Sequence, residues 1–275
     1  METAKTKTLG PRLAVGFGLG GVFLLSLLNP MLFVGLLSVA TAAAGYELAN
    51  VLKRGGWHVP KYLVGLAGLL LPWVAFFWGA IAQWLTVLAA SAVMVIWRAI
   101  YLMARKESQT FKQTLRDFGA SNWALFYVPL LLSFGALLIN QPNGTAWVFG
   151  LVITVVSIDT VGYLIGRFFG KTKLSPLISP KKTWEGTLGG IILSAGLISL
   201  VANLLWKANY EGFVIALVCA IGGTIGDLAE SRLKRLANVK DSGSFMPGHG
   251  GFLDRFDSIL FAAPMVWLVC YFLYK

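Results

Sequence analysis

The sequence predicts an all-α, polytopic integral membrane protein with about nine transmembrane helices and a cytoplasmic N-terminus. Hydrophobic residues make up 57% of the 275 residues and charged residues only 13%, about half the ~25% typical of soluble proteins. The charges gather in short clusters between long apolar stretches. Because such a chain cannot cover a water-facing surface, a soluble enzyme and a disordered protein are excluded. The two cysteines both lie in apolar runs, which excludes a disulfide scaffold.

A bilayer crossing takes roughly 20 apolar residues, and this length places the expected spans at 13–28, 31–52, 62–78, 80–97, 122–139, 146–166, 187–206, 212–229 and 258–273. Asn29-Pro30 interrupts the first apolar stretch, and proline there favours a tight turn between two helices. A signal peptide is the alternative, since Ala40-Thr41-Ala42 resembles a cleavage site. The apolar region is too long for a signal peptide, so a retained helical hairpin is favoured.

The distribution of lysine and arginine supports this topology and orientation. If the N-terminus is cytoplasmic, only Lys207 and Lys275 of the 23 basic residues fall outside the cytoplasmic tail and loops. The other 21 follow the positive-inside rule. The net charge of +11 is therefore explained without nucleic-acid binding, which is not expected.

Two regions are expected along the chain. Residues 1–121 form four N-terminal membrane spans, and residues 122–275 form a catalytic region of five spans with long cytoplasmic loops at 167–186 and 230–257. The outer loops are too short to hold a folded module, so any chemistry is expected in the two long loops. Glycines four residues apart indicate close helix packing at three pairs: Gly16 with Gly20, Gly186 with Gly190, and Gly222 with Gly226.

Three carboxylates fall within predicted spans: Glu47, Asp159 and Asp227. A charge at the bilayer centre costs about 2.5–3.5 kcal/mol, so such residues usually face a partner, an ion or a polar cavity. Glu47 lies near the cytoplasmic end of its span, six residues before Lys53. Both a helix-end interaction and a functional role are open for Glu47.

Carboxylates and shaped loop residues predict a magnesium site. Asp227 follows a glycine-rich stretch near the cytoplasmic end of its span, and Asp254 and Asp257 lie just before the last span in a loop rich in Gly, Pro and Asp. Mg²⁺ typically takes one or two protein carboxylates and completes its shell with water and phosphates. An ordinary solvated polar loop is the alternative interpretation.

The loop at 167–186 predicts phosphate binding. Its basic and hydroxyl side chains precede an expected helix N-terminus, where a polyphosphate could bind. The loop lacks the spacing of a Walker P-loop. A basic segment attracted to anionic lipid is the alternative.

Three motifs contain most of these charged residues. The longest comprises SRLKR (231–235), KD (240–241) and PGHGGFLDRFD (247–257); the others are SPKKTWEG (179–186) and the stretch from Asp159 through Tyr163 to Arg167. Together they resemble the motifs of the phosphatidate cytidylyltransferases, also called CDP-diacylglycerol synthases. The resemblance covers about residues 155–260. Met246 and Gly162 depart from the family pattern, where another apolar residue and alanine are expected, and both lie away from the charged groups.

The resemblance implies transfer of a cytidylyl group from CTP to phosphatidic acid, with Mg²⁺ as cofactor. It assigns metal binding to Asp227 and Asp254, with Asp257 and Asp159 as secondary candidates. Nine further side chains, three of them neutral or acidic, are candidates for handling phosphate. Lys181, Lys182 and Thr183 would hold CTP, Glu185 would orient a lysine or cap the helix, Lys234, Arg235, Lys240 and Arg255 would neutralise lipid phosphate or pyrophosphate, and His249 would donate a hydrogen bond.

Other interpretations stay open at this stage. A CTP-dependent polyprenol kinase or a CDP-archaeol synthase would share the substrate logic, while an inactive scaffold homologue would have lost some of the charged motif residues, all of which are present. A secondary transporter is disfavoured because the polar residues crowd one membrane face. The simplest expected location is the bacterial inner membrane, with the active face cytoplasmic and the chain forming a homodimer.

Overall fold

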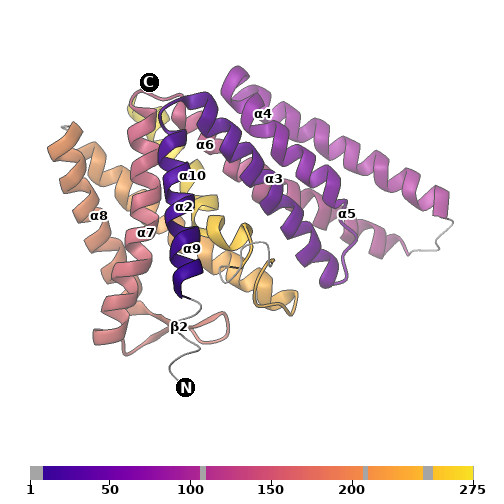
Figure 1. Cartoon of the computed structure of the whole chain (residues 1–275). Coiled ribbons are helices and arrows are strands. Elements are labelled where there is room, and N and C mark those ends of the chain that lie inside the picture. Colours follow the sequence, from indigo (N-terminus) through magenta and orange to yellow (C-terminus); the bar gives the residue numbers. More distant parts are fainter. Residues whose placement is uncertain (1–8, 106–109, 207–209, 244–249, 275) are drawn as a thin grey trace. The chain divides into compact units, whose positions relative to one another are not determined.

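The computed structural model describes residues 9–105, 110–206, 210–243 and 250–274, and it is built almost wholly from helices (Figure 1). This confirms the all-α class. The elements in chain order are α2 (Leu9–Ser26), α3 (Pro30–Arg54), α4 (Lys61–Arg105), α5 (Phe111–Leu125), the π-helical turn η1 (Phe126–Leu130), α6 (Leu131–Ile139), α7 (Gly144–Phe169), β1 (Lys173–Ser175), β2 (Ser179–Thr183), α8 (Trp184–Trp206), α9 (Tyr210–Leu236) and α10 (Leu253–Leu273).

Seven helical segments among the described residues are long and apolar enough to cross a membrane, so the chain is a multi-pass membrane protein. The prediction of nine separate spans is not confirmed. The described apolar part of α2, Gly16–Ser26, is shorter than a full crossing, and the predicted spans at 62–78 and 80–97 lie within the single element α4.

Helix α4 nevertheless changes direction between those two predicted spans. It runs for 45 residues, about 68 Å at 1.5 Å per residue and twice the thickness of a ~30 Å hydrocarbon core. Gly79 interrupts it with φ 77° and ψ −170°. Glycine adopts this positive φ because it lacks Cβ. The break lies between the predicted spans, where the sequence separates them.

The turn between α2 and α3 forms as predicted. Pro30 occupies the first turn of α3, and the side-chain Oδ1 of the N-cap residue Asn29 accepts a hydrogen bond from Met31 N at 2.8 Å. Proline loses nothing at this position because the first amides of a helix have no intrahelical acceptor. The interruption in the apolar stretch is therefore a helix boundary.

The chain forms two compact units. One extends to Ala136 and includes Leu236–Phe256; the other comprises Leu137–Arg235 and the chain from Asp257 onward. Residues 122–136 and 236–256, which the sequence analysis grouped with the C-terminal region, thus belong by contacts to the first unit.

In the first unit, α3 packs along α4, and α4 contacts α5 and η1 (Figure 1). The α3–α4 crossing is close because a Cβ on Gly68 would lie 2.8 Å from Thr41 O. A buried ion pair joins α4 to α5: Arg98 Nη2 lies 2.7 Å from Asp117 Oδ2, and the Asp117 side chain is 1% exposed. Arg116 also contacts Asp117, at 3.2 Å.

In the second unit, α7 packs along α8 through glycines (Figure 1). A Cβ on Gly190 would lie 3.0 Å from Gly162 Cα, and a Cβ on Gly186 would lie 2.7 Å from Gly162 O. Gly222 approaches α10 in the same way, with a Cβ 2.9 Å from Ala262 Cα. These contacts confirm close packing for two of the three predicted glycine pairs. A Cβ on Gly16 or Gly20 meets no described atom within 4 Å.

Candidate active site

The hairpin of β1 and β2 carries the basic motif to the start of α8 (Figure 1). The two strands are antiparallel, with Lys173 opposite Thr183 and Ser175 opposite Ser179. Because side chains alternate along a strand, neighbouring lysines point to opposite faces. Lys181 is exposed, whereas Lys182 forms an ion pair with Asp227 of α9. The structure thus distinguishes two lysines for which the motif predicted the same role, CTP binding.

Thr183 and Glu185 build the junction between hairpin and helix. The buried Thr183 Oγ1 accepts a hydrogen bond from Gly186 N at 3.1 Å in the first turn of α8. Gly166 and Gly186 pack against this hydroxyl, each with a Cβ position about 3 Å from it. The Glu185 carboxylate accepts a hydrogen bond from Thr172 N at 3.1 Å. These bonds fix the direction in which Lys182 leaves the strand.

Two carboxylates of the second unit, Asp227 and Asp159, interact with Lys182, and a third, Asp257, interacts with those two. Asp159 also interacts electrostatically with Asp227. A small pocket is lined by Asp159, Lys182, Thr224 of α9 and Ser258 of α10 among others. We call Asp159, Lys182, Asp227 and Asp257 the hairpin cluster. The structure therefore brings together three of the four predicted metal-binding carboxylates and one predicted phosphate-binding lysine.

A glycine permits this arrangement at the crossing of α9 and α10. A Cβ on Gly226 would collide with the main-chain carbonyl oxygen of Asp257. Because that atom belongs to the backbone, no rotamer change could relieve the clash. Gly226 therefore lets Asp227 and Asp257 approach each other from neighbouring helices.

The donor set of the hairpin cluster fits a hard divalent cation. Carboxylate and hydroxyl oxygens are the ligands that Mg²⁺ prefers, and one or two carboxylates suffice when water and substrate phosphates fill the other positions. Within the described residues, no three His, Cys, Asp or Glu side chains are grouped so that they could hold a metal ion by themselves. A metal here would therefore depend on oxygens that the substrate brings.

Asp254, the fourth predicted metal ligand, lies in the first unit in a network of hydrogen bonds. Its Oδ2 accepts from Ser242 N at 3.0 Å, from Ser242 Oγ at 2.9 Å and from Gly251 N at 2.8 Å. Ser242 Oγ also lies 3.1 Å from Glu47 Oε2, which accepts from Leu253 N at 3.0 Å. We call Glu47, Ser242, Gly251, Leu253 and Asp254 the loop cluster.

The remaining predicted cations occupy different settings. Lys234 Nζ lies 2.6 Å from Oε2 of the buried Glu230, one turn earlier in α9, so its ammonium group is paired with a buried carboxylate. Arg235, Lys240 and Arg255 are exposed. His249 and Met246 lie outside the described residues.

A family comparison covers both units. The sequence profile of the cytidylyltransferase family matches residues 11–273. The chain belongs to this family. Among its relatives is the "Phosphatidate cytidylyltransferase" of Mycobacterium bovis, 33% identical over 280 residues that cover 98% of this chain and 90% of the relative.

Two further relatives carry the same name. That of Bacillus subtilis is 34% identical over 260 residues, covering 90% of this chain and 92% of the relative. That of Thermotoga maritima is 35% identical over 244 residues, covering 86% of each chain. The matches thus extend well beyond residues 155–260, the part for which the motifs alone indicated a resemblance.

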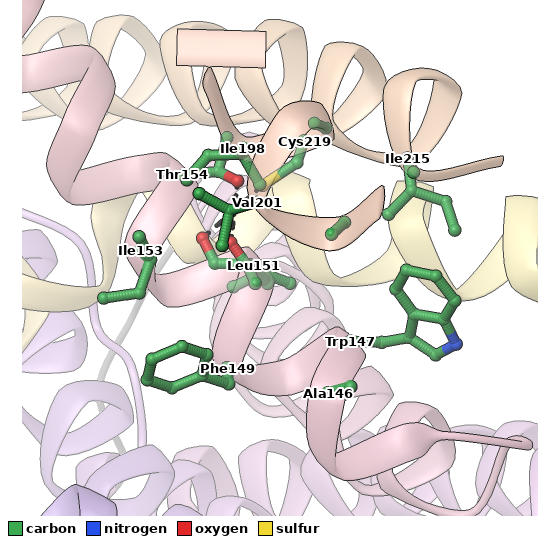
Figure 2. Close-up of a pocket in the computed structure, with 14 residues that line it drawn as sticks. Ala146, Trp147, Phe149, Leu151, Ile153, Thr154, Ile198, Val201, Ile215 and Cys219 are labelled. Atoms are coloured by element: carbon green, nitrogen blue, oxygen red, sulfur yellow. Dashed lines mark hydrogen bonds between the residues drawn. The ribbon is translucent and has the colours of Figure 1, made fainter. Parts of the chain in front are cut away.

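The second unit of this cytidylyltransferase-family chain also contains an apolar pocket. A cavity of about 40 Å³ lies among α7, α8 and α9 and is lined almost entirely by apolar side chains (Figure 2). Trp147, Leu151, Val201 and Cys219 surround it. It has no cationic side chain and is far smaller than the ~300 Å³ of a typical ligand pocket. The charged residues of the two clusters are therefore the better candidates for catalysis.

The sequence did not identify the partners of Glu47. It left open a helix-end interaction near Lys53, whereas the carboxylate contacts Ser242 and Leu253, which lie 195 and 206 residues further along the chain. Its acidic character within a span was the only signal available in the sequence.

Proposed function

We propose that the protein transfers the cytidylyl group of CTP to phosphatidic acid, giving CDP-diacylglycerol and pyrophosphate for phospholipid biosynthesis. The observation that carries this proposal is the pairing of Lys182 with Asp227. It places a cation suited to phosphate beside a carboxylate suited to a metal. Family membership and the printed names of full-length relatives support the same reaction.

The chemistry needs little from a general base. A phosphomonoester has a second pKa near ~6, so the phosphate of phosphatidic acid is already largely a dianion at neutral pH. One of its oxygens attacks the α-phosphorus of CTP, the bond from that phosphorus to the bridging oxygen breaks, and pyrophosphate leaves with the electron pair. The demand on the protein is to neutralise and align two anions that repel each other.

We assign metal binding to Asp227 and Asp254, with Asp257 and Asp159 in supporting roles. Mg²⁺ bound there would neutralise developing charge on the phosphates. In the structure, the ammonium group of Lys182 pairs with the carboxylate of Asp227. When CTP is bound, Lys182 would move its contact to a phosphate oxygen.

The other motif residues divide by setting. Lys181 is exposed beside Lys182 and would contact the outer phosphates of CTP. Thr183 would join it after the hairpin adjusts, because in this structure the Thr183 hydroxyl accepts a hydrogen bond from Gly186 N. Four cations are assigned to lipid phosphate or departing pyrophosphate: Lys234, Arg235, Lys240 and Arg255. His249 is proposed as a hydrogen-bond donor to phosphate within the segment 230–257.

We also propose the finer topology: nine crossings, a cytoplasmic N-terminus, and an active face on the cytoplasmic side of the inner membrane, where CTP is available. The bias of 21 among 23 basic residues supports this orientation. A homodimer is proposed as well, and the open glycine face at Gly16 and Gly20 is compatible with pairing between copies. Cysteine-accessibility mapping and crosslinking in vesicles would test these two statements.

The reaction is tested by following the label of CTP in proteoliposomes of the purified protein. With α-³²P-labelled CTP and phosphatidic acid, we expect labelled CDP-lipid and unlabelled pyrophosphate. In parallel, γ-³²P-labelled CTP is offered with a polyprenol. Label in a phosphorylated alcohol, with CDP as the second product, would replace the proposal by a kinase. Preference for an ether-linked archaeal acceptor would replace it by CDP-archaeol synthesis.

A further inference from the structure

Glu47 is a buried carboxylate on α3 that belongs to none of the three sequence motifs. Its side chain is only 9% exposed, although a charged group inside a membrane protein is costly unless it is bonded. Glu47 Oε2 accepts hydrogen bonds from Leu253 N at 3.0 Å and from Ser242 Oγ at 3.1 Å. Ser242 lies in the loop before α10, and Leu253 is the first residue of α10, next to Asp254.

Ser242 connects the two carboxylates directly. Its backbone N donates to Asp254 Oδ2 at 3.0 Å, and its hydroxyl lies 2.9 Å from the same oxygen while remaining 3.1 Å from Glu47 Oε2. A serine hydroxyl has a single proton, so Glu47 and Asp254 compete for it or share it. The position of Asp254 is thereby coupled to that of Glu47 through one side chain.

Glycines bring the loop close around Glu47. A Cβ on Gly243 would lie 2.5 Å from Glu47 Oε1, and a Cβ on Gly251 would collide with Glu47 Oε2 and with Ser242 Oγ. Gly250 has φ 79°, and a Cβ on it would lie 2.7 Å from Asp254 Oδ2. The loop is thus shaped by three residues without side chains to wrap two carboxylates.

Glu47 also satisfies the start of α10. Leu253 is the first residue of that helix, and its amide is one of the N-terminal donors without an intrahelical acceptor. A negative charge is favourable at a helix N-terminus. Because Asp254 is the next residue, holding Leu253 also fixes the direction in which Asp254 leaves the helix.

We propose that Glu47 is a positioning residue: it orients Asp254 through Ser242 and through the amide of Leu253, and it contacts neither substrate. This proposal rests on the proposed function for its kinetic consequence, because Asp254 is assigned there to metal binding. Its structural part, the coupling of the loop to α3, does not depend on the reaction.

The test compares Glu47→Ala and Glu47→Gln with the matched control Thr41→Val. Thr41 is buried six residues earlier on the same helix, and its hydroxyl donates a hydrogen bond to Leu37 O of that helix. Glutamine keeps the shape of Glu47 and one acceptor oxygen, so this variant is expected to fold and to rescue part of the effect. Thr41→Val removes a buried polar group without touching the loop.

The first readout is amide hydrogen exchange of the full chain without CTP or metal. In Glu47→Ala the amide of Leu253 loses its acceptor, and a displaced Asp254 weakens the hydrogen bonds that it accepts from Ser242 N and Gly251 N. Exchange at these three amides should therefore accelerate by about 10-fold or more in Glu47→Ala, by less in Glu47→Gln, and not in Thr41→Val. Unchanged exchange at these amides in Glu47→Ala overturns the proposal, whatever the activity.

The second readout is kinetic. A misplaced Asp254 should lower kcat by about 30-fold or more in Glu47→Ala and raise the Mg²⁺ concentration needed for half-maximal rate, with KM for CTP changed by less than about 3-fold. If Glu47→Ala exchanges faster at these amides but has the same kcat as Thr41→Val, the proposal that Glu47 positions Asp254 for catalysis is overturned. Glu47 would then only hold the loop in place. If the wild-type protein forms no CDP-lipid, the proposed function fails, and the exchange result alone decides whether Glu47 holds the loop.

Discussion

The hairpin cluster and the loop cluster each contain carboxylates, but they stabilise them differently. In the hairpin cluster, Asp227 is paired with the ammonium group of Lys182, on a two-stranded hairpin. In the loop cluster, Asp254 is held by backbone amides and the hydroxyl of Ser242. The first arrangement relies on a long, rotatable cation and the second on short, fixed donors.

This difference separates the tasks that a nucleotidyl transferase must combine. A flexible ammonium group on an extended side chain can leave a carboxylate for an incoming phosphate, since an ion pair near water is weak. A carboxylate held by two backbone amides and a hydroxyl keeps one orientation with or without substrate. We therefore expect the hairpin cluster to respond to CTP and the loop cluster to be preformed.

The largest effect is expected from neutralising either assigned metal ligand. Asp227→Asn and Asp254→Asn should each lower Mg²⁺-dependent CDP-lipid formation by about 1,000-fold, equivalent to ~4 kcal/mol of lost transition-state stabilisation. The protein should still insert and fold. Rates measured with labelled CTP, alongside gel filtration in detergent, check this; near-normal activity of either variant would remove that residue from the metal site.

The next effect concerns the two neighbouring lysines of β2. Lys182→Ala should lower kcat/KM for CTP by about 100-fold because a charge-assisted contact to phosphate is lost. Lys181→Ala is the control on the opposite face of the strand and should lose less than about 10-fold. Steady-state kinetics over a range of CTP concentrations distinguish them, and equal losses would refute the distinction between the two lysines.

A smaller effect, on stability, should follow from filling the α9–α10 crossing. Gly226→Ala places a methyl group against the carbonyl of Asp257 and should destabilise the fold by about 1–3 kcal/mol. Gly196→Ala, on α8 with no described atom within 4 Å of its Cβ position, should be neutral or slightly stabilising. Thermal unfolding in detergent, followed by tryptophan fluorescence, compares the two. Similar transition temperatures would argue against the close crossing.

The smallest effect is expected at Glu185. Its carboxylate accepts a hydrogen bond from Thr172 N, and the amide oxygen of glutamine can accept the same bond. Glu185→Gln should therefore change the rate of CDP-lipid formation by less than about 3-fold, whereas Glu185→Ala should loosen the hairpin and raise KM for CTP. A large loss in the glutamine variant would show that the negative charge of Glu185 takes part in the reaction.

Much of the fold followed from local patterns in the sequence. Apolar length located the helices, Asn29-Pro30 marked a helix boundary, and the spacing of Gly186 and Gly190 indicated a close crossing, because each of these signals acts over one or two turns. The β1–β2 hairpin was not predicted, since strands of three and five residues show too few alternations to reveal a period.

The candidate site was predictable only in part. Lys182 was expected to bind phosphate and Asp227 to bind a metal ion, and the structure places them in an ion pair. The bonds of Glu47 to Ser242, and of Arg98 to Asp117 in the first unit, could not be foreseen. A polar side chain in an apolar span signals that a partner exists, but tertiary packing selects the partner.

The central claim is that carboxylates of both clusters act in one metal-dependent step. A double-mutant cycle tests it most directly, with Mg²⁺-dependent CDP-lipid formation measured for the wild type, Asp227→Asn, Asp254→Asn and the double variant. Residues that act as a unit are strongly non-additive, so the account predicts that the double variant retains about the same rate as either single variant. Multiplied losses, with the double variant about 1,000-fold below each single one, would contradict the claim.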